Sequence, residues 1–500
     1  MRSKNSLKTM IYGFILTFII ALIGLFKTKV LLAYLGEDSV AVYQVFSNIY
    51  TYLSLIDGGI TSAMIFYLYK PLREKNYEKV SEIVNGIRDY LNKVGCLVIV
   101  FGVIVSLNIM FFIKDTSLSS NYIKICCVIF IIANAFSYFA NSRAVLYEAE
   151  QRTYKASNLN HGLAIAKGLI EIILAMLGFD LLTLMISYLI LCLIKNTILY
   201  FVSKKDHAYL VKTKKMDKNF KKETNSLFIY KITYLIFENI DVMLLSKYVG
   251  SVSVIIYTAY FQITHMITIM AKRISSAIIP GIGDMLIDDD KKHTQDVFDE
   301  VNSMLFYIGL VICIPLYFVI NPFINIWYGS KYVASSYVSL FFVLVLFTNI
   351  ISIVLEAFIK SSGNFKSIRN YSLYQGVANL SISLLLVSKY GIAGVLFGTL
   401  FAFITGNFFS YPHILSKNVL KRKTSVYYRN CFVYLIIAIP SVLICWYVNS
   451  LLGYSYSNLL LWFINGVIIF VINFLLVTIY FKYTNNLLFF KRLKSIIKKK

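Results

Sequence analysis

The sequence predicts an all-α polytopic membrane protein with about 14 transmembrane helices, arranged as two pseudo-symmetric six-helix lobes followed by two C-terminal helices. The 500 residues are 58% hydrophobic and only 15% charged, and the mean hydropathy is +0.69; soluble domains of this size do not show such a balance. Apolar runs of about 20 residues, the length that crosses a bilayer, recur along the whole chain. Lysine and arginine collect in alternate segments between those runs, as expected for a polytopic protein.

Each predicted span is an apolar run that is bounded by polar or charged residues. The runs are 10–35, 39–69, 94–113, 122–147, 159–179, 181–203, 226–249, 253–280, 301–327, 336–360, 371–389, 391–411, 430–450 and 458–481. The first run resembles a signal peptide, but no small-residue cleavage site follows it and the helical pattern continues past Lys27. We therefore expect it to be the first span.

The distribution of positive charge predicts the topology. With both termini in the cytoplasm, the inward segments hold about 36 of the 49 lysine and arginine residues. The outward loops hold about three, at Lys114, Lys124 and Lys331. This asymmetry predicts an even number of spans, and the outward loops are all short.

A lysine-rich segment and an internal repeat predict the domain organisation. We expect an N-lobe over 1–205, a basic cytoplasmic loop over 206–225, a C-lobe over 226–412, and two further spans with a basic tail over 413–500. Shifting the sequence by about 214 positions aligns the residues that follow Tyr34, including Gly36 and Tyr43, with those that follow Tyr248. Such a repeat is typical of transporters that bind substrate between two lobes.

The seventh run carries polar residues on one helical face. Its increments of 3, 4, 3 and 7 residues place them in one stripe: Lys231, Tyr234, Glu238, Asp241 and Tyr248. The first run has a matching face with Thr17, Gly24, Lys27 and Tyr34, and the repeat aligns Lys27 with Asp241, so that opposite charges occupy equivalent positions. A cation at mid-bilayer costs roughly 3 kcal/mol, so Lys27 is expected to face a water-filled cavity, while Lys29 points elsewhere.

The second and eighth runs also have a polar face. That of the second run includes Asn48, and that of the eighth includes Gln262, His265 and Lys272. We expect these helices to line a cleft between the lobes near the membrane midplane, where polar side chains are tolerated. The predicted substrate-binding residues are Lys27, Tyr34, Asn48, Tyr234, Gln262, Lys272 and Arg273.

The charged residues leave two interpretations open. Lys27 forms either a static pair with Glu238 or Asp241, or a cluster that exchanges partners with a ligand. Lys231, Glu238, Asp241 and His265 form the group expected to act in ion coupling or in a pair between the lobes, although His265 is also typical of polar packing. Lys167 and Glu171 stand four residues apart on the fifth run, and a local pair is expected there.

Four stretches occur in a characteristic order along the chain: LSLIDGGITSAMI (53–65), DVMLLSKYVGSVSVIIYTAY (241–260), INIWYGSKY (324–332) and YGIAGVLFGT (390–399). In these stretches the sequence resembles bacterial polysaccharide (lipid-linked oligosaccharide) flippases of the multidrug/oligosaccharidyl-lipid/polysaccharide exporter superfamily, proteins of the bacterial cytoplasmic membrane. The resemblance covers nearly the whole chain. It implies translocation of undecaprenyl-pyrophosphate-linked oligosaccharide repeat units to the outer leaflet, and basic residues such as Lys27 in a central cavity.

The sequence argues against other classes of protein. It contains no Gly-rich phosphate loop, metal-ligand spacing or nucleophile constellation, so we expect no enzyme, cofactor or metal, and its scattered basic clusters argue against nucleic acid. A lipid II flippase or a multidrug/cation antiporter of the same superfamily remains as the alternative, and coupling to H⁺ or Na⁺ is left open. The expected partners are the lipid-linked oligosaccharide, membrane lipids and a polysaccharide polymerase machinery.

Overall fold

The computed structural model of the chain is all helical in the residues that it describes, and these include eleven helices long and apolar enough to cross a membrane. The described residues are 2–54, 60–211, 240–287, 290–362, 365–452, 458–484 and 486–487. The predicted fold class, an all-α polytopic membrane protein, is confirmed. The chain divides into two compact units, Met1–Ile255 and Ile256–Lys500, which are described in turn.

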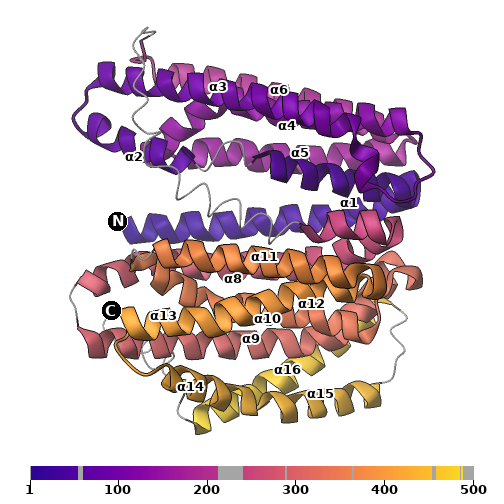
Figure 1. Cartoon of the computed structure of the whole chain (residues 1–500), viewed down its shortest axis with the longest axis vertical. Coiled ribbons are helices and arrows are strands. Elements are labelled where there is room, and N and C mark those ends of the chain that lie inside the picture. The colour runs from indigo at the N-terminus through magenta and orange to yellow at the C-terminus, as the bar shows by residue number, and fades with distance from the viewer. Residues whose placement is uncertain are drawn as a thin grey trace. The chain divides into compact units, whose positions relative to one another are not determined.

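The first unit is built from long helices that are coloured indigo to magenta in Figure 1. They are α1 (Arg2–Leu53), α2 (Ile60–Arg73), α3 (Tyr77–Leu107), α4 (Ser120–Ala149), α5 (Tyr154–Met176) and α6 (Leu181–Asp206). Helix α4 packs against both α3 and α6, and α5 packs against α1. Residues 240–248 are also helical, and they cover the end of the predicted seventh span.

Gly36 separates two helical parts of α1. Its φ of 80° lies in the left-handed region, which glycine adopts without steric cost. The predicted first span and the start of the second therefore follow each other across a single kinked residue, rather than across a loop. Gly250, which the repeat aligns with Gly36, also has a positive φ, of 124°, and the aligned pair Tyr43 and Tyr257 is equally buried.

Two predicted boundaries in the first unit are wrong. The second run, 39–69, is not one helix, because α1 ends at Leu53 and a separate helix, α2, begins at Ile60. Helix α3 begins at Tyr77, well before the expected start near residue 94. Its first half carries charged residues such as Arg88, which an apolar-run criterion excludes although they are compatible with a helix.

The second unit contains the remaining helices. They are α8 (Ser251–Ile287), which starts in the first unit, α9 (Lys291–Tyr328), α10 (Ser336–Ser361), α11 (Phe365–Tyr390), α12 (Ile392–Phe403), α13 (Tyr411–Asn418), α14 (Thr424–Ile436), α15 (Ala438–Leu452) and α16 (Leu459–Tyr483). A π-helical segment, Ile404–Ser410, joins α12 to α13. Helix α9 packs against both α10 and α16.

Small residues allow α11 and α12 to approach closely. A Cβ atom added at Gly398 would lie 2.3 Å from the Ser383 Oγ atom, and one at Gly394 would lie 2.6 Å from the Leu386 carbonyl oxygen. Gly394 and Gly398 are four residues apart, a spacing that brings helix backbones together in membranes. The stretch YGIAGVLFGT thus has a packing role in the second unit.

Candidate functional site

Lys27 takes part in a buried ion pair inside the first unit. Its Nζ atom lies 3.0 Å from the Glu171 Oε2 atom, and the Glu171 side chain is only 1% exposed whereas that of Lys27 is 22% exposed. The pair forms because α1 and α5 pack against each other. An ammonium in a membrane-spanning helix is thereby stabilised by a carboxylate that comes from far along the sequence.

The same carboxylate has two further partners. The Tyr43 hydroxyl donates a hydrogen bond of 2.7 Å to Glu171 Oε1, and Lys167 Nζ lies 3.9 Å from that oxygen. The local pair expected between Lys167 and Glu171 is confirmed. The Lys167 ammonium also lies 3.5 Å from the centre of the Tyr188 ring, an arrangement in which the ring face attracts a cation.

The cluster of Lys27, Tyr43, Lys167, Glu171 and Tyr188 has an excess of positive charge. Two ammonium groups share one carboxylate, and the aromatic side chains add no formal charge. A net positive group in a low-dielectric region attracts anions more strongly than it would in water. Chemically, such an excess of positive charge is compatible with an anionic ligand, and the two lysine side chains are exposed to similar extents, 22% and 19%.

A static pair of Lys27 with Glu238 or Asp241 was one of two interpretations of the sequence, and among the described residues a different carboxylate lies beside Lys27. Lys27 pairs with Glu171, whereas Asp241 is buried in the helix that covers residues 240–248. The physical reason is that α5 packs on α1 and brings its own acid to the cation. The predicted roles of Lys231, Tyr234 and Glu238 lie outside the described residues.

Two other predicted residues of the first unit do not belong to the cluster. Tyr34 is exposed, and Asn48 is half-buried and donates its amide to the Gln44 carbonyl oxygen at 2.8 Å. Thr51 and Ser47 likewise bond back to carbonyl groups of α1. These polar side chains therefore donate hydrogen bonds to carbonyl groups of their own helix. Lys29 is exposed, as expected for a side chain that points away from Lys27.

The remaining predicted residues lie on α8, in the second unit. Gln262, His265, Lys272 and Arg273 are all half-buried. The His265 ring stacks on the Phe261 ring, with centroids 4.9 Å apart, which fits polar packing. Because each unit is described by itself, the expected meeting of these four residues with Lys27 at one cleft stays a prediction.

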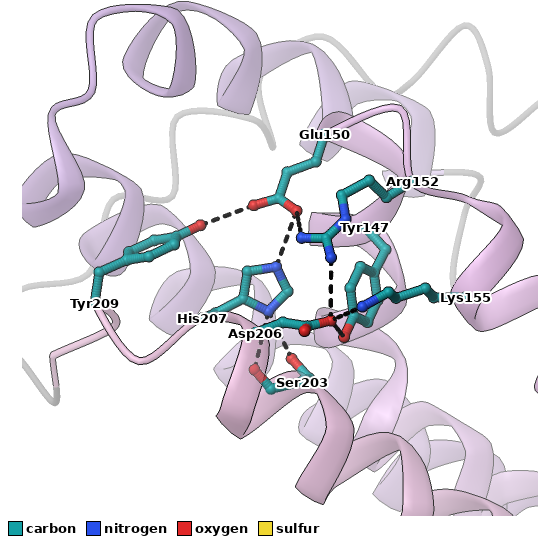
Figure 2. Close-up of polar contacts among 8 residues, drawn as sticks. All are labelled: Tyr147, Glu150, Arg152, Lys155, Ser203, Asp206, His207 and Tyr209. Carbon is teal, nitrogen blue, oxygen red and sulfur yellow. Dashed lines mark hydrogen bonds and ion pairs between the residues drawn. The ribbon is translucent and has the colours of Figure 1, made fainter.

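A second polar cluster lies at the end of the first unit where α4 and α6 terminate (Figure 2). The Asp206 carboxylate accepts hydrogen bonds from the Tyr147 hydroxyl, at 2.7 Å, and from Lys155. The Glu150 carboxylate contacts His207 Nε2 at 3.0 Å and accepts from the Tyr209 hydroxyl at 2.9 Å. We call this group the polar latch, because it ties the segment after α6 to the end of α4.

The electrostatics of the latch follow from these contacts. Burial raises the pKa of the Tyr209 phenol, and its hydrogen bond to Glu150 raises that pKa further. Arg152 bridges both acids, with nitrogen atoms 3.4 Å from Glu150 and 3.4 Å from Asp206. The latch is thus a structural network at ordinary pH.

Sequence reasoning missed the partnership of Lys27 with Glu171 and the latch. The sequence did signal the partner of Lys27, because Glu171 is an acid within the apolar fifth run. Sequence spacing pairs Glu171 only with Lys167, its neighbour on the same helix. For the latch, the signal was a concentration of acids and aromatic residues at the ends of two spans, but pairs more than 50 positions apart leave no periodic pattern.

Comparisons with known proteins agree with this architecture. A family model described as "Polysaccharide biosynthesis protein" matches residues 87–337. A solved structure titled lipid II flippase MurJ, in an inward closed conformation, has a TM-score of 0.72 at 15% identity and covers 94% of this chain and 98% of that one. Comparison with curated proteins finds no significant match.

Two further structures share the fold. An inward-facing multidrug resistance MATE family transporter of the MOP superfamily has a TM-score of 0.66 at 13% identity, covering 80% of this chain and 96% of that one. A MOP superfamily transporter from Pyrococcus furiosus, whose title reports a reverse polarity of the binding pocket, has a TM-score of 0.57 at 13% identity and covers 83% and 97%. The resemblance found in the sequence is confirmed at the level of the family and the fold.

Proposed function

The chain belongs to the polysaccharide biosynthesis protein family, and from that premise we propose that it is a flippase for undecaprenyl-pyrophosphate-linked oligosaccharide repeat units. It would move them from the cytoplasmic to the outer leaflet of the bacterial cytoplasmic membrane by alternating access. Membership of the family, the many membrane-spanning helices and the fold shared with MurJ and MATE transporters support this proposal.

The excess positive charge around Glu171 is the observation that carries the choice of an anionic substrate. Lys27 and Lys167 share that single carboxylate, and their side chains are exposed to similar extents, 22% and 19%. A pyrophosphate can take Lys27 as a charge-assisted hydrogen-bond donor while Glu171 keeps Lys167. The two lysines thus have different roles: one contacts the ligand, and the other keeps the carboxylate neutralised.

Translocation requires a polar route for the head group. Stripping each sugar hydroxyl of water without a replacement bond costs on the order of kilocalories, and an unpaired charge costs far more. The water-filled cleft that the polar helix faces of the sequence predict would remove that barrier. We assign Tyr34, Asn48 and Tyr234 to that cleft from the first half of the chain, and Gln262, Lys272 and Arg273 from the second.

The membrane potential favours the proposed direction. With the inside negative by 100 mV, each negative charge that moves outward gains about 2.3 kcal/mol, so coupling to H⁺ or Na⁺ is not required energetically. If an ion is coupled, Lys231, Glu238, Asp241 and His265 are the proposed participants. Both termini in the cytoplasm, and a polysaccharide polymerase as partner, complete the proposal.

Deletion of the gene, followed by mass spectrometry of lipid-linked intermediates, tests the function directly. The proposal expects undecaprenyl-pyrophosphate oligosaccharides to accumulate, and wild-type protein to clear them. The variant Lys27→Ala should fold but not clear them, whereas Lys29→Ala, two positions along the same helix at an exposed site, serves as the matched control. Normal oligosaccharide lipids in the deletion strain would refute the function.

A lipid II flippase is the second candidate, because the structure with a TM-score of 0.72 carries that title. Both substrates present a pyrophosphate on a polyprenyl chain, so the cationic cluster does not separate them. Complementation of a strain depleted of its lipid II flippase distinguishes the two substrates. Growth of that strain would favour lipid II, and transport of a cationic dye by purified protein would favour an antiporter.

A further inference from the structure

A pocket between α3, α4 and α6 in the first unit concentrates positive charge away from the Lys27 cluster. Its volume is about 250 Å³, and its polar lining includes Ser81, Asn85 and Arg88 from α3, Ser142 and Arg143 from α4, and Lys204 from α6. No aspartate or glutamate is among the described residues that line it. The pocket therefore holds three cations with no acid in its wall.

Neither guanidinium in this pocket has a carboxylate partner among the described residues. Arg143 stacks over the Tyr200 ring, with its Cζ atom 4.3 Å from the ring centre, and Arg88 lies close enough to act on it electrostatically. Arginine remains charged at any physiological pH. Two like charges that share a half-enclosed space repel each other, and an anion between them would remove that repulsion.

An adjoining groove is mainly apolar and continues along α4 and α6. It is lined by Phe136, Ala140, Leu193 and Thr197, and it shares Phe139, Arg143 and Tyr200 with the cationic pocket. Leu193 and Tyr200 are exposed on the outer surface of these spans. The groove thus leads from the cations along the part of the helices that is apolar enough to lie in hydrocarbon.

The segment after α6, which the polar latch holds in place, forms one wall of the pocket. His207 and Val211 line it; the Val211 amide donates to the Ser81 hydroxyl at 3.1 Å, and Asn85 donates to the Val211 carbonyl oxygen at 3.4 Å. His207 is in turn fixed by Glu150 and Ser203 (Figure 2). The wall is therefore held in place by hydrogen bonds of the protein itself, which makes the pocket preformed.

From this geometry we propose that the pocket and groove bind one anionic glycerophospholipid, with its phosphate between Arg88, Arg143 and Lys204 and one acyl chain along Phe136 and Leu193. Basic pockets between membrane helices on the cytoplasmic side bind such head groups. By the topology predicted from the positive charges, this end of α3, α4 and α6 faces the cytoplasm. The ligand differs from the transported substrate, and the site requires only the first unit.

Lipid retention by the purified full-length protein tests the proposal. Delipidated protein is mixed with phosphatidylglycerol or with phosphatidylcholine of the same chains, and bound lipid is measured by native mass spectrometry. Wild type should retain phosphatidylglycerol, and the double variant Arg88→Gln with Arg143→Gln should bind it about tenfold more weakly, because two charged hydrogen bonds are lost. Arg73→Gln removes an exposed cation at the end of α2, outside the pocket, and should bind as wild type does.

The possible results distinguish a lipid phosphate from inorganic phosphate as the ligand, and additional variants cover the case in which the double variant does not fold. Equal retention by the double variant, or equal retention of the two lipids by wild type, would overturn the proposal. Protection against heat by inorganic phosphate as large as that by phosphatidylglycerol would also overturn it, because a small-anion site would then be sufficient. If the double variant does not fold, Lys204→Gln and Thr197→Trp, both at exposed positions, must each weaken phosphatidylglycerol binding; if neither does, the proposal fails.

Discussion

Replacing Glu171 by glutamine should destabilise the first unit strongly. The substitution keeps the size of the side chain and its ability to accept the Tyr43 hydrogen bond, but it removes the only negative charge in the Lys27 cluster. Lys27 and Lys167 are then left as two partly buried cations without a counterion. The perturbation is therefore electrostatic, with little change in packing.

The distances give the size of the effect. With an effective dielectric constant of about 20, contacts of 3.0 and 3.9 Å correspond to gross attractions of roughly 5.5 and 4.3 kcal/mol. Most of this is offset by desolvation, and removal of one partner of a buried pair costs about 3 to 5 kcal/mol in measured cases. We expect Glu171→Gln to lower the free energy of unfolding by about 3 kcal/mol.

Unfolding of purified protein in mixed micelles, followed by circular dichroism, measures that loss. Glu82→Gln is the matched control, because Glu82 pairs with Lys79 at 3.1 Å on a more exposed part of α3, where such a pair contributes about 0.5 kcal/mol or less. If Glu171→Gln unfolds like Glu82→Gln, the carboxylate does not hold the two lysines and the reasoning about the cluster is refuted.

Three further predictions concern packing, a helix cap and the latch. Gly398→Ala should reduce the yield of folded protein, because the new Cβ would lie 2.3 Å from Ser383 Oγ, whereas Gly466→Ala, with its nearest contact at 3.5 Å, should not; equal yields in size-exclusion chromatography would contradict the close approach. Burial alone would raise the pKa of Asp180, but hydrogen bonds from Thr183 and Tyr122 outweigh it and lower that pKa below the usual range. The stability that Asp180 contributes is therefore complete above its usual pKa near 4 and is lost as the pH falls through the lowered value; Asp180→Ala should cost about 1 kcal/mol at pH 7, and melting curves in which the cost is the same at pH 2 would contradict this. Glu150→Ala removes the carboxylate that contacts both His207 and Tyr209, and it should speed tryptic cleavage after Lys204 and Lys205. Unchanged cleavage kinetics would contradict this.

Hydropathy and positive charge could predict the fold because, in the bilayer, the backbone N–H and C=O groups of a spanning segment must form hydrogen bonds within that segment, as they do in a helix. The predicted runs at 181–203, 336–360 and 458–481 agree closely with α6, α10 and α16. The same criterion misplaced the start of α3, since its first half is charged and extends beyond the apolar run. It also treated 39–69 as one span, although the chain changes helix between Leu53 and Ile60.

The candidate site was only partly predictable. A lysine within an apolar run is unusual, so Lys27 could be identified from its neighbours in the sequence. Its partner could not, because Glu171 lies on another helix and the choice between acids depends on which helices pack together. The repeat suggested Asp241, but a repeat relates equivalent positions and does not specify contacts between them. Arg88 was overlooked for a related reason: it precedes the apolar run that defined the third span.

The most direct test of the central claim is the rate at which purified protein flips a fluorescent undecaprenyl-pyrophosphate oligosaccharide in liposomes. We propose that Lys27, which lies 3.0 Å from Glu171 in the structure, exchanges this carboxylate for the pyrophosphate, while Glu171 keeps Lys167. Lys27→Gln should therefore lower the initial rate at least tenfold, and Lys27→Arg should retain most of it. Flipping by folded Lys27→Gln at the wild-type rate would contradict the account.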